Sequence, residues 1–307
     1  MTPVGSGRAE LFRALGALAE PPTPEHARLA EALGLPGRPD GAEYAQIFLL
    51  NLYPYASAHL GPDGMLGGEA RDRVAGFWRA LAVAPPSEPD HLGALLGLLA
   101  ALAEREDGIE EGAERALLAQ ARAALVHEHI LPWLPVFLLC VREWGSPFYA
   151  AWAELLDEAL AEERGRTALA DRELPVHLRA LDPIPDPRSG EEGAGEAFVR
   201  ALLAPARSGM LLTRQDLDHA GLELGLGVRI GERAYVLKAL LSQDARATLA
   251  WLAAEARRWA GVHGDMQVND EVVAGFWRDR AQAAAGLLDE LASTEVGEER
   301  PMESRHA

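Results

Sequence analysis

Apolar residues recur at spacings of three and four along nearly all of the chain, and no stretch alternates apolar and polar residues as a half-buried strand does. Leu and Ala dominate the apolar content, and aromatic residues make up only 6% of the chain. This composition favours helices, because strands are enriched in β-branched and aromatic residues. We therefore expect an all-α fold. A chain of 307 residues can form one large helical domain or two smaller ones.

The expected helices fall into two groups, separated by the stretch LDPIPDPRSGEEGAG. This stretch is rich in Pro, Gly and Glu, which predicts an exposed linker. The periodicity predicts N-terminal helices at about 8–20, 24–34, 41–52, 67–83, 87–106, 109–130 and 146–165. The expected organisation is a helical domain at 1–180, the linker at 181–195, a C-terminal helical region at 196–292 and a disordered tail at 293–307.

Three local signals mark individual helix ends. Ser146 is a good N-cap with Pro147 in the first helical position, and Gly165 can end that helix. Thr213 and Asp216 have the spacing of a capping box. The hexapeptide VAGFWR occurs at 74–79 and again at 273–278, without a fixed period around it, so we interpret it as two similar amphipathic helices rather than a repeat.

Charge and cysteine content narrow the class of protein. The formal net charge is −18, which argues against a nucleic-acid partner and suits a basic peptide. Cys140 is the only cysteine and lies in an apolar run, so we expect a buried thiol, no internal disulfide and a reducing compartment. The N-terminus lacks an apolar signal-peptide core, and no apolar run approaches the ~20 residues of a membrane span. These features predict a cytoplasmic protein that does not insert into a membrane.

The segment SEPDHL, ahead of a leucine-rich stripe, contains an Asp-His pair at 90–91. The simplest interpretation is a helix start with Ser87 as N-cap, Asp90 in the first turn and His91 half-exposed beside the stripe. A metal site is an alternative, but His127 and His129 lie two apart and would point to different sides of a helix. No nucleophile elbow or nucleotide-binding glycine motif occurs, so no reaction can be assigned from these residues.

Several stretches together resemble the TorD/DmsD/NarJ family of redox-enzyme maturation chaperones. The features are Tyr44 and Phe48 in a Tyr-x-x-x-Phe pattern, a Gly-rich turn at 61–68, and Pro89-Asp90-His91-Leu92. The stretch 127–156 is similar to later helices of the family. The resemblance covers about 40–160, and the chain continues well beyond it.

The resemblance implies a helical bundle of the TorD-like chaperone type, with further helices after the linker, and a binding role without catalysis or a cofactor of its own. The implied partners are the twin-arginine signal peptide and the apo form of a molybdopterin-dependent oxidoreductase. The family's exchange of helical segments between protomers also allows a homodimer. The implied peptide-binding residues are Phe77, Trp78, Leu81, Glu88, Pro89, Asp90 and His91.

Carboxylates such as Glu88 and Asp90 can hold a guanidinium through charge-assisted hydrogen bonds, while aromatic and leucine side chains can contact the apolar part of such a peptide. Two alternatives remain. One is a helical metal-dependent hydrolase that uses His91, His127 and His129, and the other is a helical scaffold or regulator without a peptide site.

Overall fold

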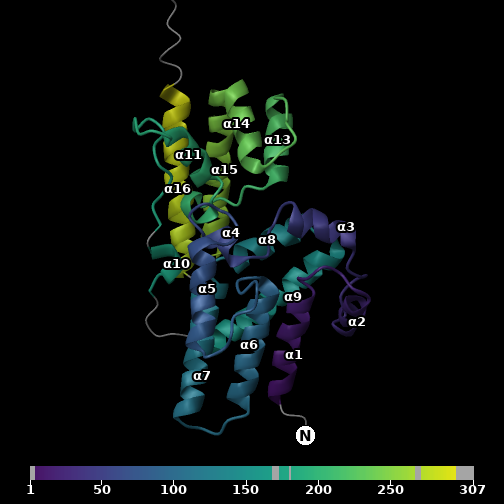
Figure 1. The fold of residues 1–307 in the computed structure, drawn as a ribbon. Helices are drawn as coiled ribbons and strands as arrows, with labels where there is room; N and C mark the ends of the chain where they lie inside the picture. Colours follow the sequence, from purple (N-terminus) through teal and green to yellow (C-terminus); the bar gives the residue numbers. More distant parts are fainter. Residues whose placement is uncertain (1–3, 168–172, 180, 267–270, 295–307) are drawn as a thin grey trace, which may run out of the picture. The chain divides into compact units, whose positions relative to one another are not determined.

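The computed structural model describes residues 4–167, 173–179, 181–266 and 271–294. Within these ranges the chain forms helices, and the only β-type pairing is an isolated bridge between Tyr55 and His91. The all-α fold is therefore confirmed for this part of the chain. The chain divides into two compact units, Met1–Ala180 (unit 1) and Leu181–Ala307 (unit 2), drawn in purple to teal and in teal to yellow (Figure 1).

Unit 1 is a bundle of helices in which α1, α6 and α7 lie side by side (Figure 1). Its elements are α1 (Val4–Ala17), α2 (Pro24–Ala32), α3 (Gly41–Tyr44), the π-helix η1 (Ala45–Leu49), α4 (Ala56–Leu60), α5 (Gly68–Ala80), α6 (Leu92–Asp107), α7 (Ala113–Ala124), the π-helix η2 (Leu125–Ile130), α8 (Leu134–Trp144), α9 (Pro147–Arg166) and α10 (Val176–Arg179).

Several predicted helix ends differ from the observed ones. The helix expected at 41–52 changes from α to π geometry after its first turn, and the one expected at 109–130 does so near its C-terminal end. The spacing of apolar residues reveals neither change. The predicted start of α9 is confirmed, because the Ser146 hydroxyl accepts a hydrogen bond from the Phe148 N–H at 3.2 Å. Its predicted end at Gly165 was wrong, because the helix continues to Arg166 and Thr167 is the C-cap.

Helices α1 and α6 approach each other closely where two glycines meet. A Cβ atom on Gly16 would lie 3.2 Å from the Leu96 Cβ, and one on Gly93 would lie 3.0 Å from the Gly16 carbonyl oxygen. Any side chain at either position would therefore push the helices apart. This close approach brings the residues that follow α1 to the N-terminus of α6.

The core of unit 1 is built around an aromatic cluster from η1, α8 and α9. The Phe48 ring lies 6.0 Å from the Phe137 ring and 5.2 Å from the Tyr149 ring, and Trp152 packs against both Phe48 and Tyr149. The Trp152 Nε1–H donates to the Leu15 carbonyl at 3.0 Å, so α9 is also tied to α1. Cys140 is buried, as expected.

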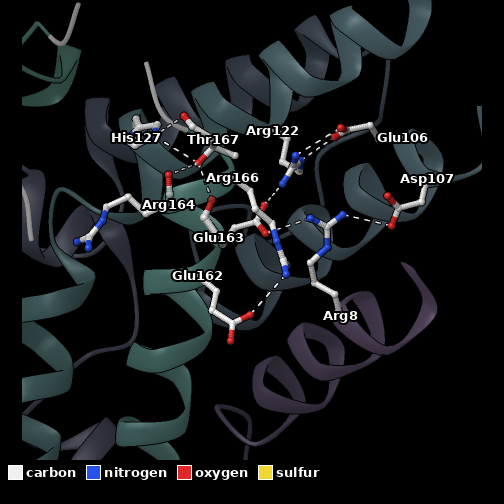
Figure 2. Close-up of polar contacts among 10 residues, drawn as sticks. All are labelled: Arg8, Glu106, Asp107, Arg122, His127, Glu162, Glu163, Arg164, Arg166 and Thr167. Atoms are coloured by element: carbon white, nitrogen blue, oxygen red, sulfur yellow. Dashed lines mark hydrogen bonds and ion pairs between the residues drawn. The ribbon is translucent and has the colours of Figure 1, made fainter. Parts of the chain in front are cut away.

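A buried ion network joins α1, α6, α7 and α9 (Figure 2). The Arg122 guanidinium donates to Glu106 at 2.7 Å and to Glu163, and Arg8 pairs with Glu163 at 3.3 Å and with Asp107 at 3.2 Å. Burial acts to lower the pKa of Arg122, but the carboxylates of Glu163 and Glu106 outweigh it and raise that pKa. Removing one partner of such a buried pair typically costs about 3–5 kcal/mol, so the network fixes one arrangement of the four helices.

Unit 2 is a second helical group in which α15 and α16 make the most extensive contact. Its elements are α11 (Ala194–Leu202), α12 (Pro205–Ser208), α13 (Arg214–Leu224), α14 (Arg233–Gln243), α15 (Ala245–Asp265) and α16 (Glu271–Thr294). The predicted capping box of α13 is confirmed, with the Asp216 N–H donating to the Thr213 hydroxyl at 3.2 Å and the Thr213 N–H donating to the Asp216 carboxylate at 2.8 Å.

The predicted linker at 181–195 is largely attached to unit 2. Ile184 is buried, Arg207 donates to the carbonyls of Asp182 and Pro183, and Arg188 pairs with Glu290 of α16. The longest continuous exposed run in this stretch is 188–193. Of the predicted disordered tail, 293 and 294 belong to α16, and 295–307 lie outside the described residues.

Candidate functional site

Helix α5 ends just after its two adjacent aromatic residues. Phe77, Trp78 and Leu81 are each half-buried, and the helix ends at Ala80 with Leu81 as its C-cap. The Val83 N–H donates to the Trp78 carbonyl at 3.1 Å, which closes the turn. Ala82 holds a φ of 55°, and it is the only non-glycine residue in the described part of the chain with a positive φ. A left-handed alanine is strained, so this turn is tightly specified by its surroundings.

The loop from Pro85 to His91 returns from α5 to α6 and fixes the aromatic end of α5. The Trp78 indole N–H donates to the Pro89 carbonyl at 3.2 Å, and Arg71 donates to the Ser87 carbonyl at 3.0 Å. Glu88 is exposed, whereas Pro89, Asp90 and His91 are buried. The seven residues predicted from the family resemblance therefore lie in one neighbourhood, but only the first four have solvent-accessible side chains.

The predicted start of α6 was wrong. The helix begins at Leu92, and its N-cap is His91 rather than Ser87, because the His91 Nδ1 accepts from the Gly93 N–H at 3.1 Å. Asp90 is not in a helical turn, and His91 is 4% exposed rather than half-exposed. The Ser-x-x-Asp spacing resembles a capping box, but the partner of Asp90 comes from elsewhere in the chain.

That partner is the segment 54–57, which leads into α4 and includes its first two residues. The Asp90 carboxylate accepts from the Ser57 N–H at 3.1 Å, and the Asp90 carbonyl accepts from the Ala56 N–H at 3.0 Å. The Leu92 N–H donates to the Pro54 carbonyl at 2.8 Å, so the two segments are bonded on both sides of the pair. Asp90 is thus a buried residue whose carboxylate bonds to the first turn of α4 and holds it against the loop before α6.

His91 lies between an amide and a carboxylate. Its Nδ1 is 3.1 Å from the Gly93 nitrogen and 3.0 Å from Oε1 of Glu20, which follows α1. Burial lowers the pKa of His91, against the opposing effects of Glu20, Glu88 and Asp90. A neutral ring whose Nδ1 accepts from Gly93 is the form that this pKa favours near neutral pH. The Glu20 side chain is half-exposed, so it is free to bind a cation from solution.

Two carboxylates therefore face solvent beside the Asp-His pair. Glu88 accepts a hydrogen bond from the Tyr55 hydroxyl at 2.7 Å, and the Tyr55 ring lies 4.8 Å from the His91 ring. Burial and the Glu88 carboxylate raise the pKa of Tyr55 well above its usual value, so this phenol remains a donor. Sequence reasoning missed Glu20, because no local pattern indicates that a residue before Pro21 meets the start of a helix at Leu92.

The other candidate metal ligands have structural partners. The His127 Nε2 lies 2.8 Å from the Thr167 carbonyl (Figure 2), and the His129 Nδ1 lies 3.0 Å from the His177 Nε2. The two side chains thus point to different partners, as their spacing predicts. Within the described residues, no three His, Cys, Asp or Glu side chains are grouped so that they could hold a metal ion. His91, His127 and His129 do not form the site that the hydrolase alternative requires.

No single described helix is long and apolar enough to span a membrane. One bent pair of segments, Ala113–Ile130 with Leu134–Trp144, is long and apolar enough when its two parts are taken together, judged by length and composition only.

Part of unit 1 matches a known protein family. Residues 23–138 match the family described as the nitrate reductase delta subunit, and this range contains α2 to α7 and the whole Asp-His neighbourhood apart from Glu20. The resemblance to the TorD/DmsD/NarJ family is thereby confirmed for this region of the chain.

Individual relatives support the same family. The chain is 32% identical over 123 residues to the chaperone protein TorD of Vibrio cholerae serotype O1, which covers 37% of this chain and 56% of the relative. It is 30% identical over 119 residues to TorD of Aeromonas salmonicida, covering 38% and 54%. The chain thus spans about half the length of the curated relatives that it matches.

Proposed function

We propose that this chain is a maturation chaperone for a molybdopterin-dependent oxidoreductase, acting in the cytoplasm without catalysis of its own. The observation that carries the proposal is the match of 23–138 to the nitrate reductase delta subunit family, together with the similarity of the chain to curated TorD chaperones. The partner that we propose for unit 1 is the twin-arginine signal peptide of the apo-oxidoreductase.

The arrangement at the end of α5 supports peptide binding. The half-buried side chains of Phe77, Trp78 and Leu81 offer apolar surface. The exposed Glu88 precedes Pro89, whose carbonyl accepts from the Trp78 indole. Apolar and aromatic side chains beside a few charged groups are typical of peptide-binding surfaces. We propose that these residues contact the peptide directly.

The two solvent-accessible carboxylates, Glu20 and Glu88, match in number the two arginines of the signal peptide. We propose that Glu20 and Glu88 each bind a guanidinium, because carboxylates bind this planar group through paired hydrogen bonds that an ammonium cannot reproduce. Asp90 and His91 are buried, so in this proposal they position the loop and the helix start rather than touch the peptide. The net charge of −18 favours the encounter with a basic peptide.

Calorimetric titration with a twin-arginine signal peptide and with its Lys-Lys variant tests the proposal. We expect saturable binding that weakens about ten-fold or more with the Lys-Lys peptide, as well as with Glu88→Gln and Glu20→Gln. The matched control is Glu111→Gln, which neutralises an exposed carboxylate in the loop after the far end of α6.

Two results would contradict the proposal. The first is the absence of saturable binding to the signal peptide of any molybdopterin-dependent oxidoreductase of the same organism. The second is an equal loss of affinity in Glu111→Gln, which would show that only the general negative charge matters.

A further inference from the structure

Unit 2 exposes large apolar side chains within one short part of its sequence. Ile230 is 97% exposed, Leu222 is 78% exposed and Tyr235 is 48% exposed. Leu222 lies in the last turn of α13, Ile230 in the loop 225–232 and Tyr235 in the first turn of α14. This part of the chain lies outside the family match at 23–138, so the chaperone resemblance does not account for it.

The loop that carries Ile230 is held in place by side chains from both neighbouring helices. The Arg214 guanidinium donates to the carbonyls of Gly231 at 2.7 Å and Arg229 at 3.0 Å, and its own orientation is set by Asp218 at 2.8 Å. Gln243 of α14 donates to the Gly227 carbonyl at 2.9 Å and accepts from the Gly227 N–H at 2.8 Å. Ile230 is therefore exposed on a loop that hydrogen bonds hold in one conformation.

Ile230 buries almost none of its surface within unit 2, so it contributes little hydrophobic stabilisation there. Burying such a side chain in a partner is favourable by an amount that corresponds to about ten-fold or more in affinity. Because the loop is already held by Arg214 and Gln243, little conformational entropy is lost when it binds. Ile230 therefore has the properties of an anchor for another protein's apolar pocket.

A cationic group lies next to this anchor. The exposed Arg229 donates to the Tyr235 hydroxyl at 3.1 Å, and no ion pair joins it to a carboxylate in the described part of the chain. In a chain of net charge −18, this side chain can select a partner surface with a carboxylate beside its apolar pocket. Arginine and tyrosine are also the residue types most enriched at energetically important interface positions.

The small size of this surface limits the choice of partner. A stable free-standing interface buries about 1,200–2,000 Å² in total, and three side chains supply only a small part of that area. A weak contact becomes effective when a second contact on the same partner raises the effective concentration. The occupant should therefore be a protein that the chain already holds by another site.

We propose that Ile230, flanked by Arg229 and Tyr235, inserts into an apolar pocket beside a carboxylate on the folded body of the oxidoreductase whose signal peptide unit 1 binds. This inference rests on the proposed function. It assigns to unit 2 the recognition of the folded client, while unit 1 recognises the peptide.

The test compares two probes against the full-length chain. One is the intact apo-oxidoreductase with its signal peptide, and the other is the isolated signal peptide. We expect Ile230→Ser to weaken binding of the intact protein about ten-fold and to leave the affinity for the peptide unchanged. Arg229→Glu should also weaken binding of the intact protein, most strongly at low ionic strength. The matched control is Leu117→Ser, which removes a 65% exposed leucine from α7 of unit 1.

The outcomes separate this inference from the proposed function. Equal affinity of wild type and Ile230→Ser for the intact apo-oxidoreductase overturns it, and so does an equal loss of affinity for the isolated peptide. Sedimentation showing a dimer that Ile230→Ser abolishes also overturns it, because the occupant would be a second copy. If the peptide does not bind at all while the intact protein binds in an Ile230-dependent manner, the peptide proposal fails and the role of Ile230 stands.

Discussion

The hexapeptide VAGFWR occurs in both units, and its two copies have different environments. In α5 the tryptophan, Trp78, is half-buried and its indole donates to a loop carbonyl, that of Pro89. In α16 the tryptophan, Trp277, is 3% exposed and stacks on His263 with ring centroids 5.9 Å apart. The phenylalanines differ as well, since Phe77 lies against His129, and Phe276 lies under the Arg280 guanidinium.

The difference follows from where each helix ends. Helix α5 ends at Ala80, directly after the hexapeptide, so its aromatic residues lie at a helix terminus beside a loop. Helix α16 continues to Thr294, and α15 covers the same residues along its length. One set of side chains therefore forms a candidate binding surface in one unit and a core in the other. The four predictions below test this contrast.

The largest expected effect is in the buried copy. Trp277→Ala should destabilise unit 2 by about 3–5 kcal/mol, because it removes a buried indole and leaves a cavity beside His263. Chemical denaturation followed by far-ultraviolet circular dichroism measures this change. Unchanged stability would mean that the α15–α16 core does not depend on this side chain.

Both copies lie against a histidine whose pKa is lowered, and this predicts an acid-sensitive stability. Burial, with the charge of His177, lowers the pKa of His129 to about 3. Burial lowers that of His263 to about 4, helped by Arg258 and opposed by the hydrogen bond with Gly209. The folded state thus binds these protons more weakly than the unfolded state does. Stability is therefore full above pH 6.5 and falls as the pH decreases towards these values.

The expected loss is about 2 kcal/mol per histidine between pH 7 and pH 5, measured as the pH dependence of the unfolding free energy. Replacing His263 with Gln removes its titration and should flatten that part of the profile. An identical pH profile in wild type and His263→Gln would contradict the assignment.

The half-buried copy of the hexapeptide, in α5, should differ from the buried copy in two properties, stability and peptide binding. Trp78→Ala should cost only about 1–2 kcal/mol of stability, because part of the indole is already in water. It should nonetheless weaken binding of a twin-arginine peptide about ten-fold, whereas Trp277→Ala should not. Calorimetry on the two folded variants gives this comparison, and equal peptide affinities would place the binding surface elsewhere.

The smallest expected effect concerns the turn that ends α5 and has no counterpart in α16. Ala82→Gly should stabilise unit 1 by up to about 1 kcal/mol, because glycine adopts a φ of 55° without strain. The matched control is Ala80→Gly at the last residue of α5, which should destabilise by up to about 1 kcal/mol. Thermal denaturation of both variants measures the opposite signs, and two changes of the same sign would rule out strain at Ala82.

Local chemistry made part of the fold predictable. The caps at Ser146 and at Thr213 are correct because each donor and acceptor lies within three residues in the chain. The all-α class follows from a periodicity that extends over the whole sequence. The π-helical turns at η1 and η2 were missed, since they add one residue to a turn without changing which residues are apolar.

The candidate site was only partly predictable, for a physical reason. The pair Asp90-His91 was identified from the resemblance, but its burial was not, because Ser57 and Glu20 reach it from distant parts of the chain. A carboxylate three residues after a serine has the same local pattern whether it caps its own helix or bonds to another loop. Ile230 carried no sequence signal either, because an isolated apolar residue between Arg and Gly is common in buried and exposed loops alike.

The ion network of unit 1 also has a consequence for synthesis on the ribosome. Arg8 is made at the start of the chain, but its partner Glu163 follows 155 residues later. Until α9 has been translated, the carboxylate that bridges Arg8 and Arg122 does not exist, so neither guanidinium has all of its carboxylate partners. We therefore expect the nascent N-terminal helices to stay open, and to expose their apolar faces, until almost all of unit 1 has emerged.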